Sequence, residues 1–423
     1  MNAARQEFRS AFRSLEIPNY RILWWAGVFS FMSVQMQFLL RGILAWDLTE
    51  REGALGLVYL CFGLAMLVAT PLGGVAADRF PRRTVLLFSQ GAIFVGAALM
   101  GLVVLTDTVQ FWMVLVAGMI QGISFGFYGP ARMAFASDLV GRDQLGNAIT
   151  LSMLSMSATR IFAPSLAGIL AGVWFVGLGG AYLLSASMSF LSLVAIWRLP
   201  KIAIEDPSHR SPFSDIAEGV RYVRAKPQLR RLVLTSFFVI MFGFNYVAFM
   251  PALVKDVYDL GDAWLGILSS ASALGAVVVS IPLASRADSP RAKKIMAVSG
   301  LAFGSFVMLL GAVPTFWWAF AVVLVIGAFT TVYQSLSNTI ALQMSDDAHQ
   351  GRVQSLMQMS FAGFGIAAAP LGLLAEQIGL RQTIGVMGAV ALVASVIYYL
   401  AEGLRGHSSD AENAPAEARL SRT

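Results

Sequence analysis

The sequence predicts an all-α membrane protein with twelve transmembrane helices in two halves of six. The 423-residue chain is 57% hydrophobic and only 13% charged, whereas ordinary soluble domains carry about 25% charged residues. A chain of this composition cannot cover a globule of its size with polar surface. Twelve apolar runs are also long enough to cross a bilayer, which takes about 20 residues, and the longest polar connection lies between the sixth and the seventh.

The N-terminal half, residues 22–198, holds the first six spans. They run roughly Ile22–Trp46, Leu55–Ala76, Thr84–Leu105, Phe111–Phe135, Leu145–Val173 and Gly180–Trp197. Four arginines precede the first run, as in a signal peptide. The run is too long for a signal-peptide core, however, and contains Arg41 without a small-residue cleavage site. We therefore predict that it is retained as span 1, after a cytoplasmic segment of residues 1–21.

The C-terminal half, residues 232–402, holds the other six spans. They run roughly Leu232–Val254, Trp264–Ser285, Ile295–Val313, Phe316–Leu342, Val353–Leu374 and Thr383–Leu400. Residues 403–423 are rich in Ser, Ala and Glu, and we expect a disordered tail after Arg405.

The linker between the halves, residues 199–231, contains one short amphipathic segment. Ser211-Pro212 is typical of an N-cap followed by a first-turn proline, and Pro227 closes the segment. Apolar residues then recur on one helical face: Phe213, Ile216, Val220 and Val223. This pattern predicts a helix lying along the cytoplasmic membrane surface.

The distribution of basic residues predicts the orientation. One set of loops holds Arg79, Arg82, Arg83, Arg142, Arg286, Arg291, Lys293, Lys294 and Arg352, together with the linker and both termini. The opposite set holds only Arg51, Lys255 and Arg381. Since basic loops stay in the cytoplasm, both termini are predicted to be cytoplasmic. The formal charge of +6 reflects this asymmetry, so nucleic acid is not an expected partner.

The same composition argues against an enzyme, a metal site and a cofactor. Cys61 is the only cysteine and lies in an apolar run, while His209, His349 and His407 lie in polar segments. No His/Cys cluster can therefore form a metal site, and no Ser-His-Asp set can be assembled in the spans. A phosphate-binding Gly-Lys loop is also absent.

A glycine and charge motif connects spans 2 and 3. It reads Gly74-Val-Ala-Ala-Asp78-Arg79-Phe-Pro-Arg82-Arg83, and it resembles the cytoplasmic hairpin signature of the major facilitator superfamily. A tight hairpin needs a small residue for close helix approach, and an acid–base set can lock one half against the other. Asp138, near the inner end of span 4, is expected to act with it. Pro81 stands where the family usually has glycine, so the turn is expected to differ in detail.

Span 5 carries a second match. Thr159-Arg160-Ile-Phe-Ala163-Pro164-Ser-Leu-Ala-Gly168 is similar to the antiporter motif of major facilitator exporters. Pro164 removes a backbone hydrogen bond and small neighbours permit tight packing, which gives a bendable helix where the halves meet. The alternative is a proline kink without directional meaning. Span 11 echoes the segment with Ala369-Pro370-Leu-Gly372, and such repeated halves are a known transporter construction.

A third resemblance points to a branch of that superfamily. Glu218-Gly-Val-Arg221-Tyr-Val-Arg224-Ala-Lys-Pro227, Met36-Gln37 and Leu145-Gly-Asn147-Ala148 resemble enterobactin-exporter-like and macrolide-efflux-like members. The resemblance implies two six-helix bundles with spans 1, 4, 7 and 10 around a central cavity. It also implies a monomeric secondary transporter in the bacterial inner membrane that exports a small amphipathic organic molecule. An importer or lysolipid flippase, and a receptor or scaffold that does not transport, are the alternatives.

If those four spans line a cavity, aromatic side chains and a few polar groups are the expected substrate contacts. They are Gln37, Arg41, Phe125, Tyr128, Asn245, Tyr246, Phe249, Tyr333 and Asn338. Such a set suits an amphipathic ligand.

Three arginines fall inside spans, where a charge is costly and usually functional. Arg160 lies too deep in span 5 to reach an interface, so we expect a cavity-facing or gating cation. Arg41 has the alternative of extending towards Asp47 at the outer interface. Arg132 is expected to form an ion pair at the cytoplasmic end, for example with Asp138.

Coupling to a proton usually needs a titratable acid on the transport pathway. No Asp, Glu or His falls in the central third of any predicted span. Either an acid near a helix end, such as Asp47, Asp256 or Glu376, couples transport to a proton, or an anionic substrate carries charge past Arg160.

Overall fold

The computed structural model describes residues 13–141, 144–202, 212–284, 291–346 and 349–412. Within these ranges every regular element is a helix, so the predicted fold class is confirmed. Arg142, Ser211, residues 1–12 of the segment predicted to be cytoplasmic, and residues 413–423 of the tail lie outside the described residues.

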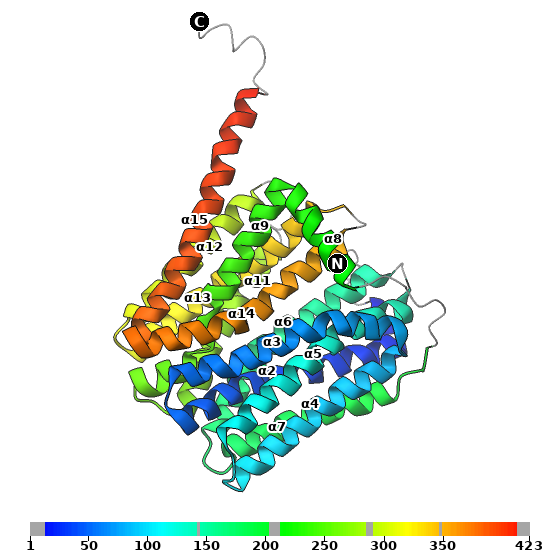
Figure 1. Cartoon of the computed structure of the whole chain (residues 1–423), viewed down its shortest axis with the longest axis vertical. Coiled ribbons are helices and arrows are strands. Elements are labelled where there is room, and N and C mark those ends of the chain that lie inside the picture. Colours follow the sequence, from blue (N-terminus) through cyan, green and yellow to red (C-terminus); the bar gives the residue numbers. More distant parts are fainter. Residues whose placement is uncertain (1–12, 142–143, 203–211, 285–290, 347–348, 413–423) are drawn as a thin grey trace, which may run out of the picture.

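The N-terminal half contains a short 3-10 turn and six long helices (Figure 1). They are η1 Arg13–Glu16, α2 Pro18–Thr49, α3 Glu52–Arg79, α4 Arg82–Leu105, α5 Phe111–Val140, α6 Leu145–Ala171 and α7 Gly177–Trp197. Helix α8, Pro212–Ala225, follows in the linker.

The C-terminal half begins with an irregular span and continues with five long helices. The irregular span comprises α9 Pro227–Phe238, η3 Val239–Gly243, η4 Phe244–Val247, α10 Met250–Ala252 and η5 Leu253–Val257. The long helices are α11 Asp262–Ala284, α12 Ala292–Ala312, α13 Phe316–Gln343, α14 Gln350–Ile378 and α15 Leu380–Glu412. Helix α15 continues past Arg405, the point at which we expected order to end, and reaches Glu412.

Ten helices of the described chain are long and apolar enough to cross a membrane, with α9 to η5 counted as one. Helices α6 and α14 have 27 and 29 residues, which suffices for the roughly 30 Å of a bilayer core. Their apolar segments are shorter, Ala158–Ala171 and Ala362–Ile378. Both helices carry many polar residues in their first halves and pack against the other half of the molecule.

The two halves have the same internal packing, and each contributes one helix to each of two contacts between them. Within the N-terminal half α3 packs on α5 and α4 on α7, and the corresponding pairs of the C-terminal half are α11 with α13 and α12 with α15. Between the halves α3 packs on α14 and α6 on α11, two pairs related by the same pseudo-symmetry (Figure 1). The halves therefore meet along two equivalent helix pairs.

Glycines bring these cross-half helices into backbone contact. A Cβ added to Gly63 would lie 2.8 Å from the Cα of Gly365, and one added to Gly168 would lie 2.6 Å from the Cα of Gly266. Small residues are what allows helices to approach this closely in membranes. Any larger side chain at these positions would force the halves apart.

The predicted span Leu232–Val254 lies within one segment that is long and apolar enough to cross a membrane, Pro227–Val257, but this segment is not a regular α-helix. The segment changes from α-helix to a π-turn at Val239–Gly243 and then to a 3-10 turn, and it has a second π-turn at Leu253–Val257. The Asn245 amide donates to the carbonyl of Met241 at 2.5 Å and to that of Phe364 at 3.0 Å, and Pro251 has no N–H to donate. Side-chain competition and a missing donor both disturb the helical hydrogen-bond ladder.

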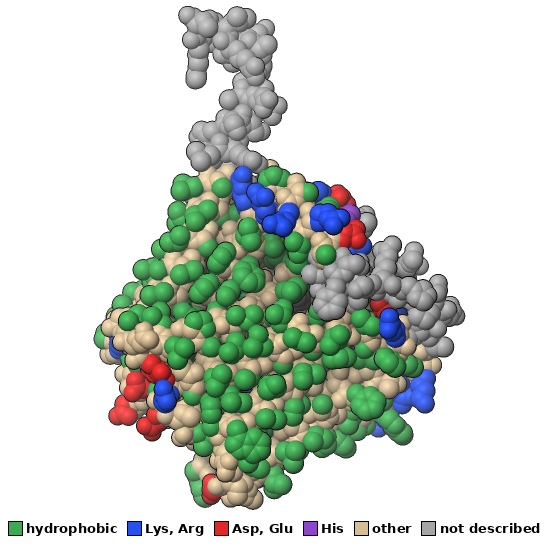
Figure 2. Space-filling view, viewed as in Figure 1, with side chains coloured by type: hydrophobic (Ala, Val, Ile, Leu, Met, Phe, Trp, Pro, Cys, Tyr) green, Lys and Arg blue, Asp and Glu red, His purple; other side chains and the backbone are tan. Residues whose placement is uncertain are grey.

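Hydrophobic side chains cover most of the visible surface (Figure 2). Carboxylates gather at one end of the helices, at the lower left of Figure 2. Lys and Arg gather mainly at the other end of the helices, at the top and right of the same view. An apolar band between two charged ends is the surface expected of a multi-pass membrane protein.

Candidate functional site

The hairpin motif ties the N-terminal half together at the end that the basic loops predict to be cytoplasmic. Arg82 forms an ion pair with Asp138 of α5, and the Arg83 guanidinium donates to the carbonyl of Trp197 at the end of α7. Asp78 is close enough to act on Arg82 electrostatically. The Arg82 and Arg83 contacts therefore join α4 to α5 and α7, all within one half.

The close helix approach in this motif occurs one residue before the expected position. A Cβ added to Gly74 would meet no described atom within 4 Å, whereas one added to Gly73 would lie 2.7 Å from the Cα of Phe127. The expectation that Gly74 provides the tight contact is therefore wrong for this conformation. Gly73 allows α3 to pack against α5.

Arg41 is buried in the N-terminal half and does not extend to the interface. Its guanidinium donates to the side-chain carbonyl of Gln121 on α5 and to the backbone carbonyl of Gln37 at 3.3 Å. The charge also lies 5.4 Å from the ring centre of Phe62, and the side chain is 1% exposed. The alternative in which Arg41 reaches Asp47 is wrong, because Asp47 pairs with Lys255.

Arg132 is not paired with Asp138, contrary to our expectation. Its guanidinium donates to Ser152 of α6 at 3.3 Å and lies 5.1 Å from the ring centre of Phe31. Gly27 provides the room, since a Cβ there would be 2.5 Å from the guanidinium. Asp138 pairs with Arg82 of α4 instead.

Arg160 makes a contact between the halves. Its guanidinium donates to the side-chain carbonyl of Gln334 on α13 at 2.9 Å, near the middle of both helices. Ala163 is fully buried, Pro164 lies inside α6, and Gly168 contacts Gly266 of α11. The whole antiporter-like segment thus lies where α6 meets the C-terminal half.

Most of the expected cavity residues are buried in this conformation. Phe125 and Asn338 are partly exposed, and the others are buried: Gln37, Arg41, Tyr128, Asn245, Tyr246, Phe249 and Tyr333. The Tyr333 hydroxyl lies 3.3 Å from that of Ser236 on α9. Gln121, which binds Arg41, and Gln334, which binds Arg160, were missed because the sequence does not show which side chains of two neighbouring helices meet.

Ion pairs join the two halves at the end that the basic loops predict to be the outer one, and we call them the outer ion pairs. Lys255 bonds to Asp47 of α2 and lies 2.6 Å from the carboxylate of Asp262. Arg51 contacts Glu376 of α14 at 3.0 Å. The position of the acids near helix ends was visible in the sequence, but the pairing across halves was not.

A second polar cluster, the linker clamp, joins α8 to the start of α14 and the residues before it. Glu218 pairs with Arg352 at 2.7 Å. The Tyr222 hydroxyl donates to Asp346 at 2.9 Å, and Lys226 pairs with the same carboxylate at 3.1 Å. The hydrogen bond from Tyr222, and then that from Lys226, lower the pKa of Asp346 below its ordinary value. Helix α8 also packs against α3, so the linker touches both halves.

Two bundles with equivalent packing that meet along two equivalent helix pairs are typical of membrane transporters. In such proteins one bundle moves against the other around a shared substrate site. A family model described as the Major Facilitator Superfamily matches residues 23–370 and 232–422. The chain belongs to this superfamily, as the hairpin motif predicted.

Curated relatives and solved structures agree with this assignment. The chain is 26% identical over 358 residues to the enterobactin exporter EntS of Shigella flexneri, covering 84% of each protein. It is 27% identical over 360 residues to EntS of Salmonella choleraesuis, covering 84% of this chain and 85% of that protein.

Among solved structures, the nucleoside transporter NupG matches with a TM-score of 0.69 and 13% identity, over 90% of this chain and 98% of that one. A bacterial homologue of the lysosomal transporter Spinster, solved in an inward-facing and unoccupied conformation, gives a TM-score of 0.73 and 14% identity over 91% and 97%. At this identity the two structures show the fold alone.

Proposed function

We propose that the chain exports a small amphipathic organic molecule, of the siderophore kind, from the bacterial cytoplasm by alternating access. The similarity to enterobactin exporters over 84% of this chain is the observation that carries the proposal. The placement of the antiporter-like segment of α6 against α11 supports it. Nothing in the comparisons favours an importer, a lipid flippase or a receptor.

The conformation supports an assignment as closed towards the outside. The outer ion pairs and the glycine contacts lie in the outer halves of the cross-half helices; a Cβ on Gly56, for example, would be 2.8 Å from the Cα of Ala369. At the inner end, a Cβ on Gly74 or Gly351 would meet no described atom within 4 Å. A substrate would then enter from the cytoplasmic side.

We propose a proton as the coupling ion and the outer ion pairs as its site of action. Among the described residues, Asp47 and Asp262 flank a single lysine, and Glu376 has a single arginine. Asp47 and Glu376 are partly exposed on that side, and they lose their cationic partners when the halves separate. Arg160, at the contact with Gln334, is the cation nearest mid-depth and is suited to an anionic group on the substrate.

Transport tests the proposal directly. An enterobactin-producing strain without its own exporter is complemented with the chain, and the siderophore in the medium is measured by mass spectrometry, together with an untargeted profile of exported compounds. We expect more extracellular siderophore or another amphipathic compound, and a loss of that increase with Arg160→Ala. A chain that is present in the membrane but changes no exported compound contradicts the proposal.

The location in the inner membrane, with both termini cytoplasmic, is tested separately. A green fluorescent protein fused after Thr423 is expected to fluoresce, and alkaline phosphatase at the same position is expected to be inactive. Cell fractionation is expected to place the protein in the inner membrane. An active phosphatase fusion contradicts the orientation without affecting the fold.

A further inference from the structure

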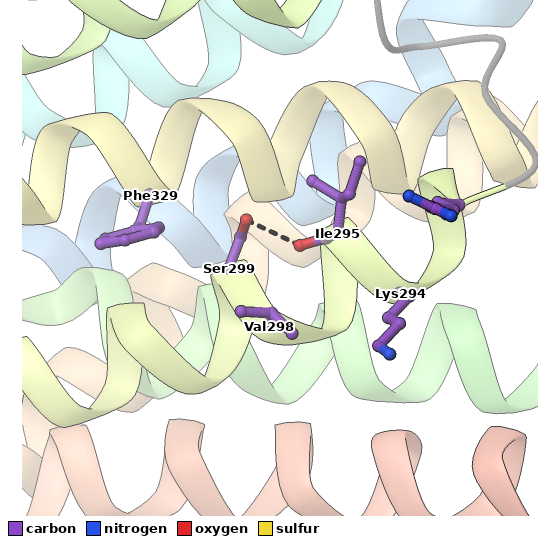
Figure 3. A pocket seen from close by; sticks show the side chains of 6 residues that line it. Lys294, Ile295, Val298, Ser299 and Phe329 are labelled. Carbon is purple, nitrogen blue, oxygen red and sulfur yellow. Dashed lines mark hydrogen bonds between the residues drawn. The ribbon is translucent and has the colours of Figure 1, made fainter.

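A groove on the C-terminal half lies between α12 and α13 and opens away from the contacts between the halves. It is an open groove with a volume of about 550 Å³. Its lining residues are Arg291, Lys294, Ile295, Val298, Ser299 and Phe329 (Figure 3). Helix α12 packs mainly on α13 and α15, so this face of the molecule looks towards the lipid.

The groove changes from charged to apolar along α12. Arg291 and Lys294 lie at the cytoplasmic start of the helix and are exposed, while Val298, one turn deeper, is 45% exposed although it is apolar. Phe329 of α13 forms the deep wall and stacks on Phe306 with ring centres 6.1 Å apart. At 1.5 Å per residue, Arg291 and Val298 are separated by about 10 Å along the helix.

The polar group inside the groove does not offer a site for a polar ligand. The Ser299 hydroxyl donates to the carbonyl of Ile295 at 2.8 Å (Figure 3). Its donor is therefore satisfied by the helix itself. The groove thus presents two cations at the level of the membrane surface and a hydrocarbon surface below them.

We propose that this groove binds an anionic phospholipid, with its phosphate between Arg291 and Lys294 and one acyl chain against Val298 and Phe329. Basic pockets between transmembrane helices on the cytoplasmic side are suited to anionic headgroups. The start of α12 adds the favourable end of the helix dipole. A zwitterionic lipid has the same phosphate and chains but no net charge to match the two cations.

Native mass spectrometry of the detergent-purified full chain tests the proposal. The protein is titrated with phosphatidylglycerol or phosphatidylcholine of identical chains, and the retained lipid is counted. Each basic residue near an anionic surface contributes about 1 kcal/mol, or about fivefold. We expect a preference for phosphatidylglycerol that falls about fivefold with Lys294→Gln.

Lys293 provides a matched control, because it is the neighbouring lysine on the same helix and does not line the groove. Lys293→Gln is expected to leave the preference unchanged, and Val298→Asp is expected to weaken binding of both lipids. Gel filtration and thermal unfolding without lipid check that each variant is folded. Inorganic phosphate at millimolar concentration is expected not to compete.

An equal loss in the Lys293 and Lys294 variants would overturn the proposal, because the attraction would then be diffuse. So would equal retention of the two lipids by the unmodified chain, or competition by inorganic phosphate. None of these outcomes depends on export, so the proposed function is tested independently.

Discussion

Lys255 is expected to hold the outer end of the transporter closed, and replacing it tests this directly. Its side chain is 18% exposed and connects Asp47 of the N-terminal half with Asp262 of its own half. In Lys255→Met the cross-half ion pair is lost and the two carboxylates face each other. A charge-assisted hydrogen bond contributes about 1.5–3 kcal/mol. A loss of about 2 kcal/mol moves the equilibrium towards outward opening by about 30-fold.

Distances between spin labels measure this opening. The background is Cys61→Ser, and spin labels are attached to the cysteines of Thr106→Cys and Thr315→Cys. Both positions are exposed, one in each half, in loops predicted to be on the outer side. We expect a longer-distance population in Lys255→Met and little change in Lys255→Arg, which retains the charge. The fraction of molecules with the longer distance between the labels measures the shift in the equilibrium.

Arg381 is the matched control, because it is also an outer cation but bonds within its own half. Its guanidinium donates to the carbonyl of Val313 at 2.8 Å and lies 5.9 Å from the ring centre of Tyr258. If Lys255→Met lengthens the distance no more than Arg381→Met does, the outer ion pairs do not hold the halves together and the reasoning is refuted.

Three further predictions follow from contacts described above. Arg160→Ala removes the bond to Gln334 between the halves and is expected to reduce transport at least tenfold. Arg132→Ala is expected to reduce transport less, because the bond of Arg132 to Ser152 lies within one half. The reverse order in a vesicle assay contradicts the prediction. Gly266→Leu places a side chain against the backbone of α6 and is expected to destabilise the contact between the halves by about 1–3 kcal/mol. The protein should remain folded but transport less, and full transport activity contradicts the prediction.

The third concerns the linker clamp: Asp346→Asn should raise hydrogen exchange in α8 severalfold at pH 7. Since the pKa of Asp346 is lowered, the contribution is present above the ordinary value of about 4 and is lost as the pH falls through the lowered value. The difference between the two proteins should shrink as the pH falls below about 4, and a difference that does not shrink on acidification contradicts this.

The sequence predicted those features that depend on composition and local order. Apolar run length located the spans, and the charged hairpin ending α3 identified the family. The small residues at Ala163 and Gly168 indicated a tight contact for α6, which the structure places against Gly266 of α11. These features are local, so one stretch of sequence contains them.

Features that depend on the relative placement of helices were not predictable. Asn245 disturbs its own helix partly because the carbonyl of Phe364, on α14, accepts its second hydrogen bond. Arg41 finds Gln121 rather than Asp47, because α5 packs directly beside α2. Gly73 rather than Gly74 meets α5, a choice set by the rotation of α3, which a single residue shift changes by about 100°.

The two glycine-on-glycine crossings have a mechanical consequence. At Gly63–Gly365 and at Gly168–Gly266 one bare backbone lies on another, without interlocking side chains that would have to disengage. Few side chains therefore have to disengage when one bundle moves against the other at these two crossings.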